Sequence, residues 1–86
     1  MFYIYILEAE DDDIYIGYTS DLKKRLVEHN QNKTFSTKNK KWRCIYYEAC
    51  LDEKDARRRE GYLKTTQGRR MLKRRIKEYL YKRRAS

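Results

Sequence analysis

Two short segments near the start of the chain have the composition of β-strands and lie close enough together to pair. Residues 2–7 and 14–18 are rich in β-branched and aromatic side chains, and a short acidic stretch separates them. This pattern predicts an antiparallel hairpin with its turn centred near Glu10, in which Tyr5 lies opposite Tyr15. Because side chains alternate between the faces of a strand, both phenols then leave the sheet on the same side.

The acidic stretch at the predicted turn admits two interpretations. Residues 8–13 carry carboxylates at every position except Ala9. Such a cluster could hold a metal ion, but consecutive carboxylates in a hairpin loop are more typical of a solvated turn. We therefore favour the solvated turn.

A helix is predicted directly after the hairpin. Residues 20–21 supply an N-cap and a first-turn acid. The inner side is marked by Leu22, Leu26 and Val27, and the helix is expected to end near residue 30.

The second half of the chain predicts one more strand and two more helices. Trp, Ile and Tyr residues within 42–50 predict a third strand of the same sheet. Asp52 caps a helix whose inner side carries Ala56 and Leu63, and a final helix is predicted for residues 69–82. The expected fold is α+β, a sandwich-like arrangement of a small three-stranded mixed or antiparallel sheet covered by about three helices.

Length and charge limit the class of protein. With 86 residues the chain can form one domain, predicted for residues 1–82, followed by a basic tail at 83–86. The formal net charge is +9 and uneven, because 14 Lys and Arg stand against 3 Asp and Glu from Lys54 onward. Basic charge concentrated at one end indicates binding to nucleic acid, since phosphate contacts release counterions. A solvated helix surface is the alternative explanation.

The same sequence speaks against a secreted or membrane protein. The apolar run at residues 1–7 lacks a basic leader and a small-residue cleavage site, and no apolar segment approaches the length of a membrane span. Cys44 and Cys50 would lie about 20 Å apart along one strand, beyond the roughly 7 Å limit for a disulfide. Two Cys and one His also provide no metal-binding spacing. We therefore expect a soluble cytoplasmic protein with buried free thiols.

Several residues suited to phosphate chemistry are predicted to lie on neighbouring elements. Arg25 and His29 are one turn apart on a helix, so they project side by side, and they follow Tyr15 closely in sequence. Glu60 lies on or beside the inner side of a later helix, where an unpaired carboxylate is costly. A salt bridge with an Arg or with Lys64 would satisfy it, as would a bound cation, and the segment alone favours the salt bridge. Together these residue types make a nuclease site the leading hypothesis.

The order of the motifs resembles the GIY-YIG nuclease superfamily, in particular its short stand-alone members, described as UPF0213 or UvrC-like (URI) domain proteins. Residues 2–7 are similar to the family's first motif, with Tyr3 in place of the name-giving glycine. Tyr15, Ile16 and Gly17 form the second motif intact.

Two later segments extend this resemblance over nearly the whole chain. Residues 19–30 are similar to the family helix that bears the catalytic arginine, here Arg25, and a His or Tyr four residues on, here His29. Residues 56–64 are similar to the segment that contributes the metal-binding glutamate, here Glu60.

The resemblance implies a metal-dependent DNA endonuclease, of the kind used in DNA repair or recombination. Glu60 would hold a single Mg²⁺ or Mn²⁺ at the scissile phosphate, and Arg25 would stabilise the transition-state charge. Tyr5 or Tyr15 would accept the proton of the attacking water, relayed with His29. A phenol has an unperturbed pKa of about 10, so nearby cations must favour its phenolate. Half-buried sheet tyrosines and a tight strand end at Gly17 are the structural alternative.

The expected partner is DNA, branched or flapped. Because no DNA-recognition domain is appended, we expect cleavage to be weakly sequence-selective, or to be targeted by DNA structure or by a partner protein. The chain departs from family nucleases in having no asparagine after Asn39 and in carrying Tyr18 where a lysine often follows the second motif. A non-catalytic nucleic-acid-binding module of the same fold and a protein-interaction module for acidic partners remain as alternatives. The residues expected to contact DNA are Lys24, Lys38, Lys40, Lys41, Lys64, Arg70 and Arg74.

Overall fold

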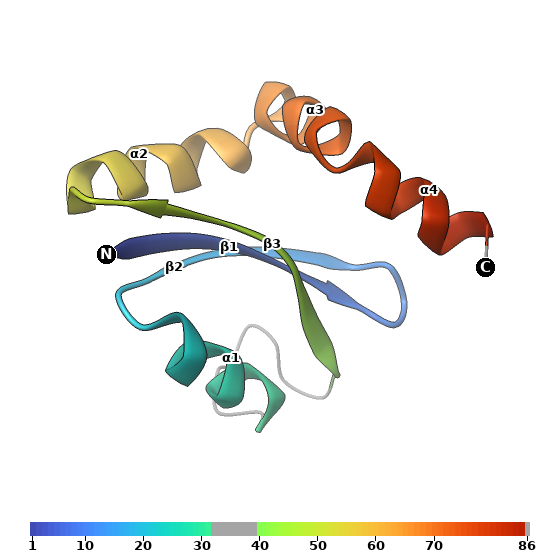
Figure 1. Ribbon diagram of the computed structural model, residues 1–86, viewed down its shortest axis with the longest axis horizontal. Helices are drawn as coiled ribbons and strands as arrows, with labels where there is room; N and C mark the ends of the chain where they lie inside the picture. Colours follow the sequence, from blue (N-terminus) through green and yellow to red (C-terminus); the bar gives the residue numbers. More distant parts are fainter. Residues whose placement is uncertain (32–39, 86) are drawn as a thin grey trace.

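A computed structural model describes residues 1–31 and 40–85, without the side chains of residues 84 and 85. Residues 33–41 are basic and have no hydrophobic periodicity, so the sequence predicts a loop there, and most of it lies outside this described part. The elements occur in the order β1 (Phe2–Ala9), β2 (Ile14–Thr19), α1 (Leu22–Asn30), β3 (Trp42–Cys50), α2 (Glu53–Leu63), α3 (Thr66–Arg75) and α4 (Lys77–Ala85) (Figure 1).

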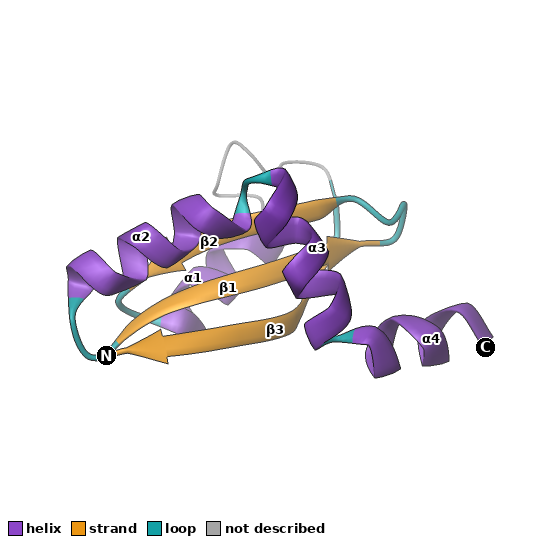
Figure 2. Cartoon of the chain, turned by 90° about the horizontal axis from the view of Figure 1, so that it is seen from above, coloured by secondary structure: helices purple, strands orange, loops and turns teal. Residues whose placement is uncertain are grey.

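The three strands form one antiparallel sheet in the order β2-β1-β3. Helix α1 lies on one side of this sheet, and α2, α3 and α4 lie on the other (Figures 1 and 2). The α+β prediction is confirmed, with antiparallel pairing throughout and four helices in the described residues rather than about three. No described helix has the length and apolar character needed to cross a membrane.

The predicted hairpin forms, but its register differs from the prediction. Tyr5 lies opposite Gly17, and Tyr15 lies opposite Leu7, so the pairing of Tyr5 with Tyr15 is wrong by two residues. The cause is the position of the turn, which follows Ala9 and places Asp12 at a φ of 68°. Aspartate adopts this left-handed conformation more readily than most residues. A shift of two residues preserves the face, so both phenols still lie on the same side.

The sequence analysis favoured a simple solvated turn for the hairpin, and the structure differs. The carboxylates of Asp11 and Asp13 are exposed but pair with Nζ of Lys40, at 2.9 Å and 2.7 Å. The carboxylate of Asp12 pairs with the Arg83 guanidinium at 2.5 Å. Basic side chains therefore neutralise the acidic turn, and such side chains are abundant in a chain of net charge +9.

Helix α1 ends where the sequence predicts but begins one residue later, because Asp21 is the N-cap rather than a first-turn acid. The Asp21 side chain accepts a hydrogen bond from the backbone N–H of Lys24 at 3.1 Å. The predicted inner residue Val27 is instead 53% exposed. The inner stripe continues from Leu26 to the fully buried His29, since positions three and four apart share a helix face.

The opposite face of the sheet carries the larger hydrophobic core. Ile4, Ile6 and Ile16 project from the strands toward the buried side chains of α2 and α3. Ala56 and Leu63 are the buried residues of α2, as predicted. Cys44 and Cys50 are free and half-buried, and they contribute to the cores on opposite faces of the sheet.

The predicted final helix, 69–82, is two helices that separate at Ile76. Helix α3 starts earlier than predicted because Thr65 caps it, accepting a hydrogen bond from the Gly68 N–H at 3.0 Å. A Cβ at Gly68 would lie within 2.7 Å of the Leu63 Cα, so this glycine permits the close approach of α2 and α3.

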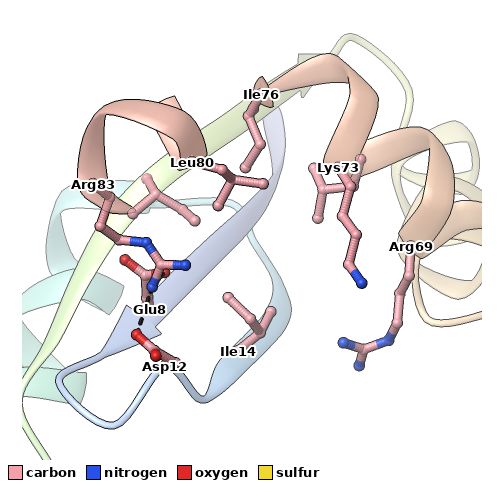
Figure 3. A pocket seen from close by; sticks show the side chains of 10 residues that line it. Glu8, Asp12, Ile14, Arg69, Lys73, Ile76, Leu80 and Arg83 are labelled. Carbon is pink, nitrogen blue, oxygen red and sulfur yellow. Dashed lines mark hydrogen bonds and ion pairs between the residues drawn. The ribbon is translucent and has the colours of Figure 1, made fainter. Parts of the chain in front are cut away.

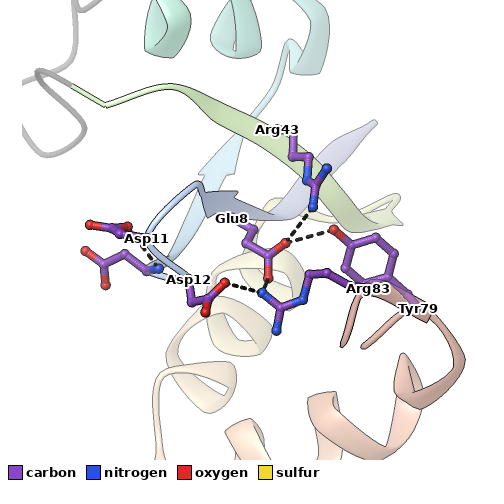
Figure 4. Close-up of polar contacts among 7 residues, drawn as sticks. Glu8, Asp11, Asp12, Arg43, Tyr79 and Arg83 are labelled. Carbon is purple, nitrogen blue, oxygen red and sulfur yellow. Dashed lines mark hydrogen bonds and ion pairs between the residues drawn. The ribbon is translucent and has the colours of Figure 1, made fainter. Parts of the chain in front are cut away.

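Helix α4 is attached to the hairpin by a buried carboxylate. Glu8 is 2% exposed, and its Oε1 accepts hydrogen bonds from the Tyr79 hydroxyl at 2.8 Å and from Arg43 Nη2 at 3.2 Å (Figure 4). Its Oε2 pairs with Nη1 of Arg83 at 2.5 Å. Arg83, which the sequence analysis placed in a tail, thus belongs to α4 and contacts the first strand.

Candidate active site

Gly17 makes room for two tyrosine rings on the α1 side of the sheet. It lies directly opposite Tyr5, whose ring extends across the space where a side chain at position 17 would stand. A Cβ at Gly17 would overlap the Tyr5 phenol and lie 2.9 Å from Cε1 of Tyr15. The centroids of the two tyrosine rings are 6.2 Å apart. The glycine of the Tyr-Ile-Gly motif therefore brings Tyr5 and Tyr15 together.

His29 joins the two tyrosines from α1. Its Nε2 lies 2.7 Å from the Tyr5 hydroxyl, and both side chains are fully buried. The imidazole also meets the Tyr15 ring edge-on, with centroids 5.0 Å apart. The sequence analysis placed His29 beside Arg25 on one helix face but did not predict its burial. Its burial depends on how α1 is rotated against the sheet, which the spacing of Leu22 and Leu26 could have indicated.

Burial controls the ionisation of the Tyr5–His29 pair. Removal from water raises the pKa of Tyr5, the neighbouring Tyr15 raises it further, and the Arg25 guanidinium lowers it by a smaller amount. Burial, together with the positive charge of Arg25, lowers the pKa of His29. Both groups are therefore neutral near pH 7, and the Tyr5 hydroxyl can donate to Nε2. Arg25 acts in the direction expected from the sequence, but burial outweighs it.

Arg25 lies at the solvent edge of this cluster. Its Nε pairs with Glu28 Oε1 at 3.2 Å, and its side chain is 38% exposed. With Thr19 and Asp21 it lines a small hollow of about 150 Å³. The guanidinium is thus close to the buried tyrosine and also accessible to a bound anion. Ile16, the middle residue of the motif, points to the other face and belongs to the larger core.

Glu60 projects from α2, on the opposite side of the sheet from α1 (Figure 1). Its side chain is 19% exposed, and Oε2 pairs with Nζ of Lys64 at 3.3 Å. The salt bridge considered in the sequence analysis is therefore present. Within residues 1–31 and 40–85, no group of three His, Cys, Asp or Glu side chains could enclose a metal ion. Mg²⁺ is commonly bound by one or two carboxylates plus substrate phosphates, so Glu60 fits a metal that binds together with nucleic acid.

Comparison with known proteins gives the family. A family model described as the GIY-YIG catalytic domain matches residues 1–74. The chain belongs to the GIY-YIG family. This family is one of nucleases, and its two signature motifs correspond to β1 and β2, the strands that carry Tyr5 and Tyr15.

Relatives described as UPF0213 proteins support this assignment. The UPF0213 proteins SpyM50708 and SpyM3_1077, from the M5 and M3 serotypes of Streptococcus pyogenes, are each 45% identical over 58 residues. The match covers 63% of this chain and 60% of each relative's length. The solution NMR structure of the UPF0213 protein BH0048 from Bacillus halodurans is 28% identical, with a TM-score of 0.53 over 84% of this chain and 82% of that one.

The predicted DNA-contacting residues of this GIY-YIG domain differ in their surroundings. Lys40 is held by two carboxylates of the hairpin turn, and Lys64 is held by Glu60, so a phosphate must compete with these carboxylates. Lys38 lies outside the described residues. Lys24, Lys41, Arg70 and Arg74 are exposed to solvent, as is the paired Lys64.

A cavity of about 530 Å³ lies away from the motif residues, between the hairpin and helices α3 and α4 (Figure 3). Its walls combine apolar and charged side chains, with Arg69 and Lys73 on α3 and the ion pair of Glu8 with Arg83 opposite them. None of the five predicted catalytic residues lines it. This cavity is therefore separate from the candidate active site.

One ion pair near α2 was missed by the sequence analysis. The Arg59 guanidinium makes two hydrogen bonds of 2.9 Å to the Glu48 carboxylate. Partial burial raises the pKa of Glu48, but the hydrogen bonds from Arg59 and Tyr46 and the positive charges of Arg59 and Arg75 together bring it below its ordinary value. The Tyr46 hydroxyl donates to the same carboxylate at 2.8 Å. These groups come from β3 and α2, so no local pattern could have paired them.

Proposed function

We propose that this protein is a divalent-metal-dependent DNA endonuclease that hydrolyses phosphodiester bonds. The observation that carries the proposal is the convergence of Tyr5, Tyr15 and His29 beside the partly exposed Arg25 in a GIY-YIG domain. Hydrolysis of a phosphodiester requires a proton acceptor for water and positive charge for the developing phosphorane, and this cluster contains both.

The exposure of the two tyrosines divides their roles. Tyr15 is half-buried, so of the two tyrosine hydroxyls it is the Tyr15 hydroxyl that meets an attacking water. Tyr5 is fully buried behind it and connects to His29. A neutral imidazole can take up a proton that passes from the phenols, and the guanidinium of Arg25 favours the anionic state of both tyrosine and phosphate.

Glu60 and Arg25 project from helices on opposite sides of the sheet, so a DNA backbone that meets both would have to pass around an edge of the sheet (Figure 1). There Glu60 would hold Mg²⁺ or Mn²⁺ at the scissile phosphate, after releasing Lys64. The bound metal would polarise that phosphate and neutralise charge on the departing oxygen. Lys64, once released, can pair with a neighbouring phosphate.

The test is cleavage of plasmid, flap and branched DNA by wild type, Glu60→Ala and Arg25→Ala, with Mg²⁺, Mn²⁺ or EDTA. Glu78→Ala, an exposed carboxylate on α4, is the matched control. We expect nicking by wild type and the control only with metal, and a loss of about 100-fold or more for the other two variants. All four proteins are first compared by circular dichroism.

The alternative is a nucleic-acid-binding module without catalysis, and the Glu60–Lys64 ion pair favours it because the carboxylate is already neutralised. In that case no substrate is cleaved, Mn²⁺ does not bind to Glu60, and wild type and Glu60→Ala bind DNA equally. Equal cleavage by wild type and Glu60→Ala would reject the site assignment.

A further inference from the structure

Part of the sheet face that carries the candidate active site is not covered by α1. Leu22 and Leu26 of α1 pack against Leu7, Ala9 and Trp42, which lie toward one end of the sheet. Toward the other end, the same face presents two further tyrosines. Tyr3 lies two residues before Tyr5 on β1, and Tyr47 is the direct neighbour of Tyr5 on β3.

These two tyrosines form an open aromatic surface. The centroids of the Tyr3 and Tyr47 rings are 6.2 Å apart, with an angle of 60° between the ring planes. Tyr47 is 56% exposed, and Tyr3 is half-buried. A single exposed aromatic residue needs no explanation, because folded proteins commonly show them. A contacting pair immediately beside Tyr5 is a more specific feature.

A groove continues from Tyr47 along α1. It has a volume of about 420 Å³ and lies between α1 and β3, where Leu22, Leu26 and Cys44 also line it. Lys23 and Lys24 follow Leu22 directly, and both are exposed. Neither makes an ion pair with the described part of the chain. The groove that continues from the aromatic surface therefore has two exposed lysines next in sequence to one of its lining residues, Leu22.

We infer that Tyr3 and Tyr47 are a stacking platform for unpaired bases next to the phosphate that is cleaved, so that the substrate of this site contains a single-stranded segment. The inference rests on the proposed function and names its substrate class. Bases inside a duplex are stacked on one another, and only unpaired bases expose their faces to aromatic side chains. The register places Tyr47 beside Tyr5 and Tyr5 beside Gly17, so the platform adjoins the proton-transfer cluster.

A protein partner is the other class of occupant for an exposed aromatic surface. Met1 and Leu51 are exposed near the same end of the sheet and would extend such an interface. The formal charge of +9 and the free Lys23 and Lys24 instead favour a polyanion. Tyrosine rings also suit bases better than aliphatic side chains do, because every base has a face that can stack on them.

The inference is tested by binding in EDTA, where cleavage cannot occur, using fluorescence anisotropy. The probes are a labelled oligothymidine, an abasic oligonucleotide of equal length and a blunt duplex. The variants are Tyr47→Ala, Tyr47→Phe and Tyr3→Leu, with Tyr81→Ala as control because Tyr81 is an exposed tyrosine on α4. The abasic strand keeps the phosphates and removes the stacking.

We expect wild type to bind oligothymidine more tightly than the abasic strand. Tyr47→Ala should weaken oligothymidine binding about 5- to 150-fold, the range for one lost stack, and leave abasic binding unchanged. Tyr47→Phe should bind as wild type, because the ring remains, and Tyr3→Leu should weaken oligothymidine binding as well.

Equal affinity of wild type for oligothymidine and the abasic strand would overturn the inference. So would a dimer, measured by light scattering, that Tyr47→Ala dissociates without any change in oligothymidine binding. If the stacking result holds while no substrate is cleaved, the platform stands and the proposed catalytic function fails. If cleavage occurs but base stacking is absent, the proposed catalytic function stands and the stacking platform fails.

Discussion

The hydroxyl of Tyr5 lies 2.7 Å from Nε2 of His29, and neither side chain is accessible to solvent. This hydrogen bond joins the central strand of the sheet to the only helix on that side in the described residues. It therefore serves two purposes: it fixes α1 against the sheet, and it joins the polar atoms of two side chains that burial keeps neutral.

Removing the hydroxyl tests the first purpose. Tyr5→Phe removes the buried hydrogen bond between the hydroxyl and the imidazole, and we expect a loss of about 1–3 kcal/mol in the free energy of unfolding. Urea unfolding of Tyr5→Phe, His29→Leu and the double variant gives the coupling between the two residues. A double variant whose loss equals the sum of the two single losses would show that the hydrogen bond contributes nothing specific.

The lowered pKa of His29 predicts a pH dependence of stability. In the unfolded chain the imidazole titrates near its ordinary value of 6.5, whereas in the folded protein it takes up a proton only at lower pH. Between these two pKa values the unfolded state binds more protons, so stability is full above pH 6.5 and falls as the pH drops toward the folded value. Urea midpoints from pH 8 to pH 5 should decline for wild type and decline less for His29→Gln, and parallel declines would contradict this assignment.

Local patterns predicted the elements of this fold better than their orientation. Asp21 and Asp52 marked helix starts, and the aromatic run at Trp42–Cys50 marked a strand, because capping and strand propensity act within a few residues. The hairpin register depended on which residue of an acidic run turns the chain. Asp12 does so, but any of its neighbours was chemically suitable.

The candidate site was predictable in its residue types and less so in its environment. The i, i+4 spacing of Arg25 and His29 correctly put them on one face. This face is partly buried, so His29 is neutral, whereas Val27 lies off the face and is exposed. Both outcomes depend on contacts with sheet residues that are many positions away in the sequence. The same reason explains why the pairing of Glu8 with Arg83 was missed.

The Glu8 carboxylate should control the docking of α4. Glu8→Ala removes the acceptor for Tyr79, Arg43 and Arg83, and breaking a buried charge pair costs roughly 3–5 kcal/mol. Hydrogen exchange should then show loss of amide protection in α4 before any loss in β1 or β2. Glu78→Ala, on the exposed side of α4, should change neither, and equal protection in wild type and Glu8→Ala would show that α4 is held by its apolar contacts alone.

Two glycines in different surroundings give a matched pair of substitutions. Gly17→Ala places a methyl group where the Tyr5 phenol lies, so we expect a loss of about 1–3 kcal/mol and a displaced tyrosine ring. A Cβ at Gly61, in the middle of α2, meets nothing within 4 Å, and Gly61→Ala should stabilise the protein by about 0.5–1 kcal/mol because alanine favours the helix. The midpoint of thermal unfolding should therefore move in opposite directions for the two variants.

Because Gly17→Ala also separates Tyr5 from His29, it should reduce any cleavage activity more than its stability loss explains, whereas Gly61→Ala should leave that activity unchanged. A Gly17→Ala protein as stable and as active as wild type would mean that the close approach of Tyr5 to this glycine is not required.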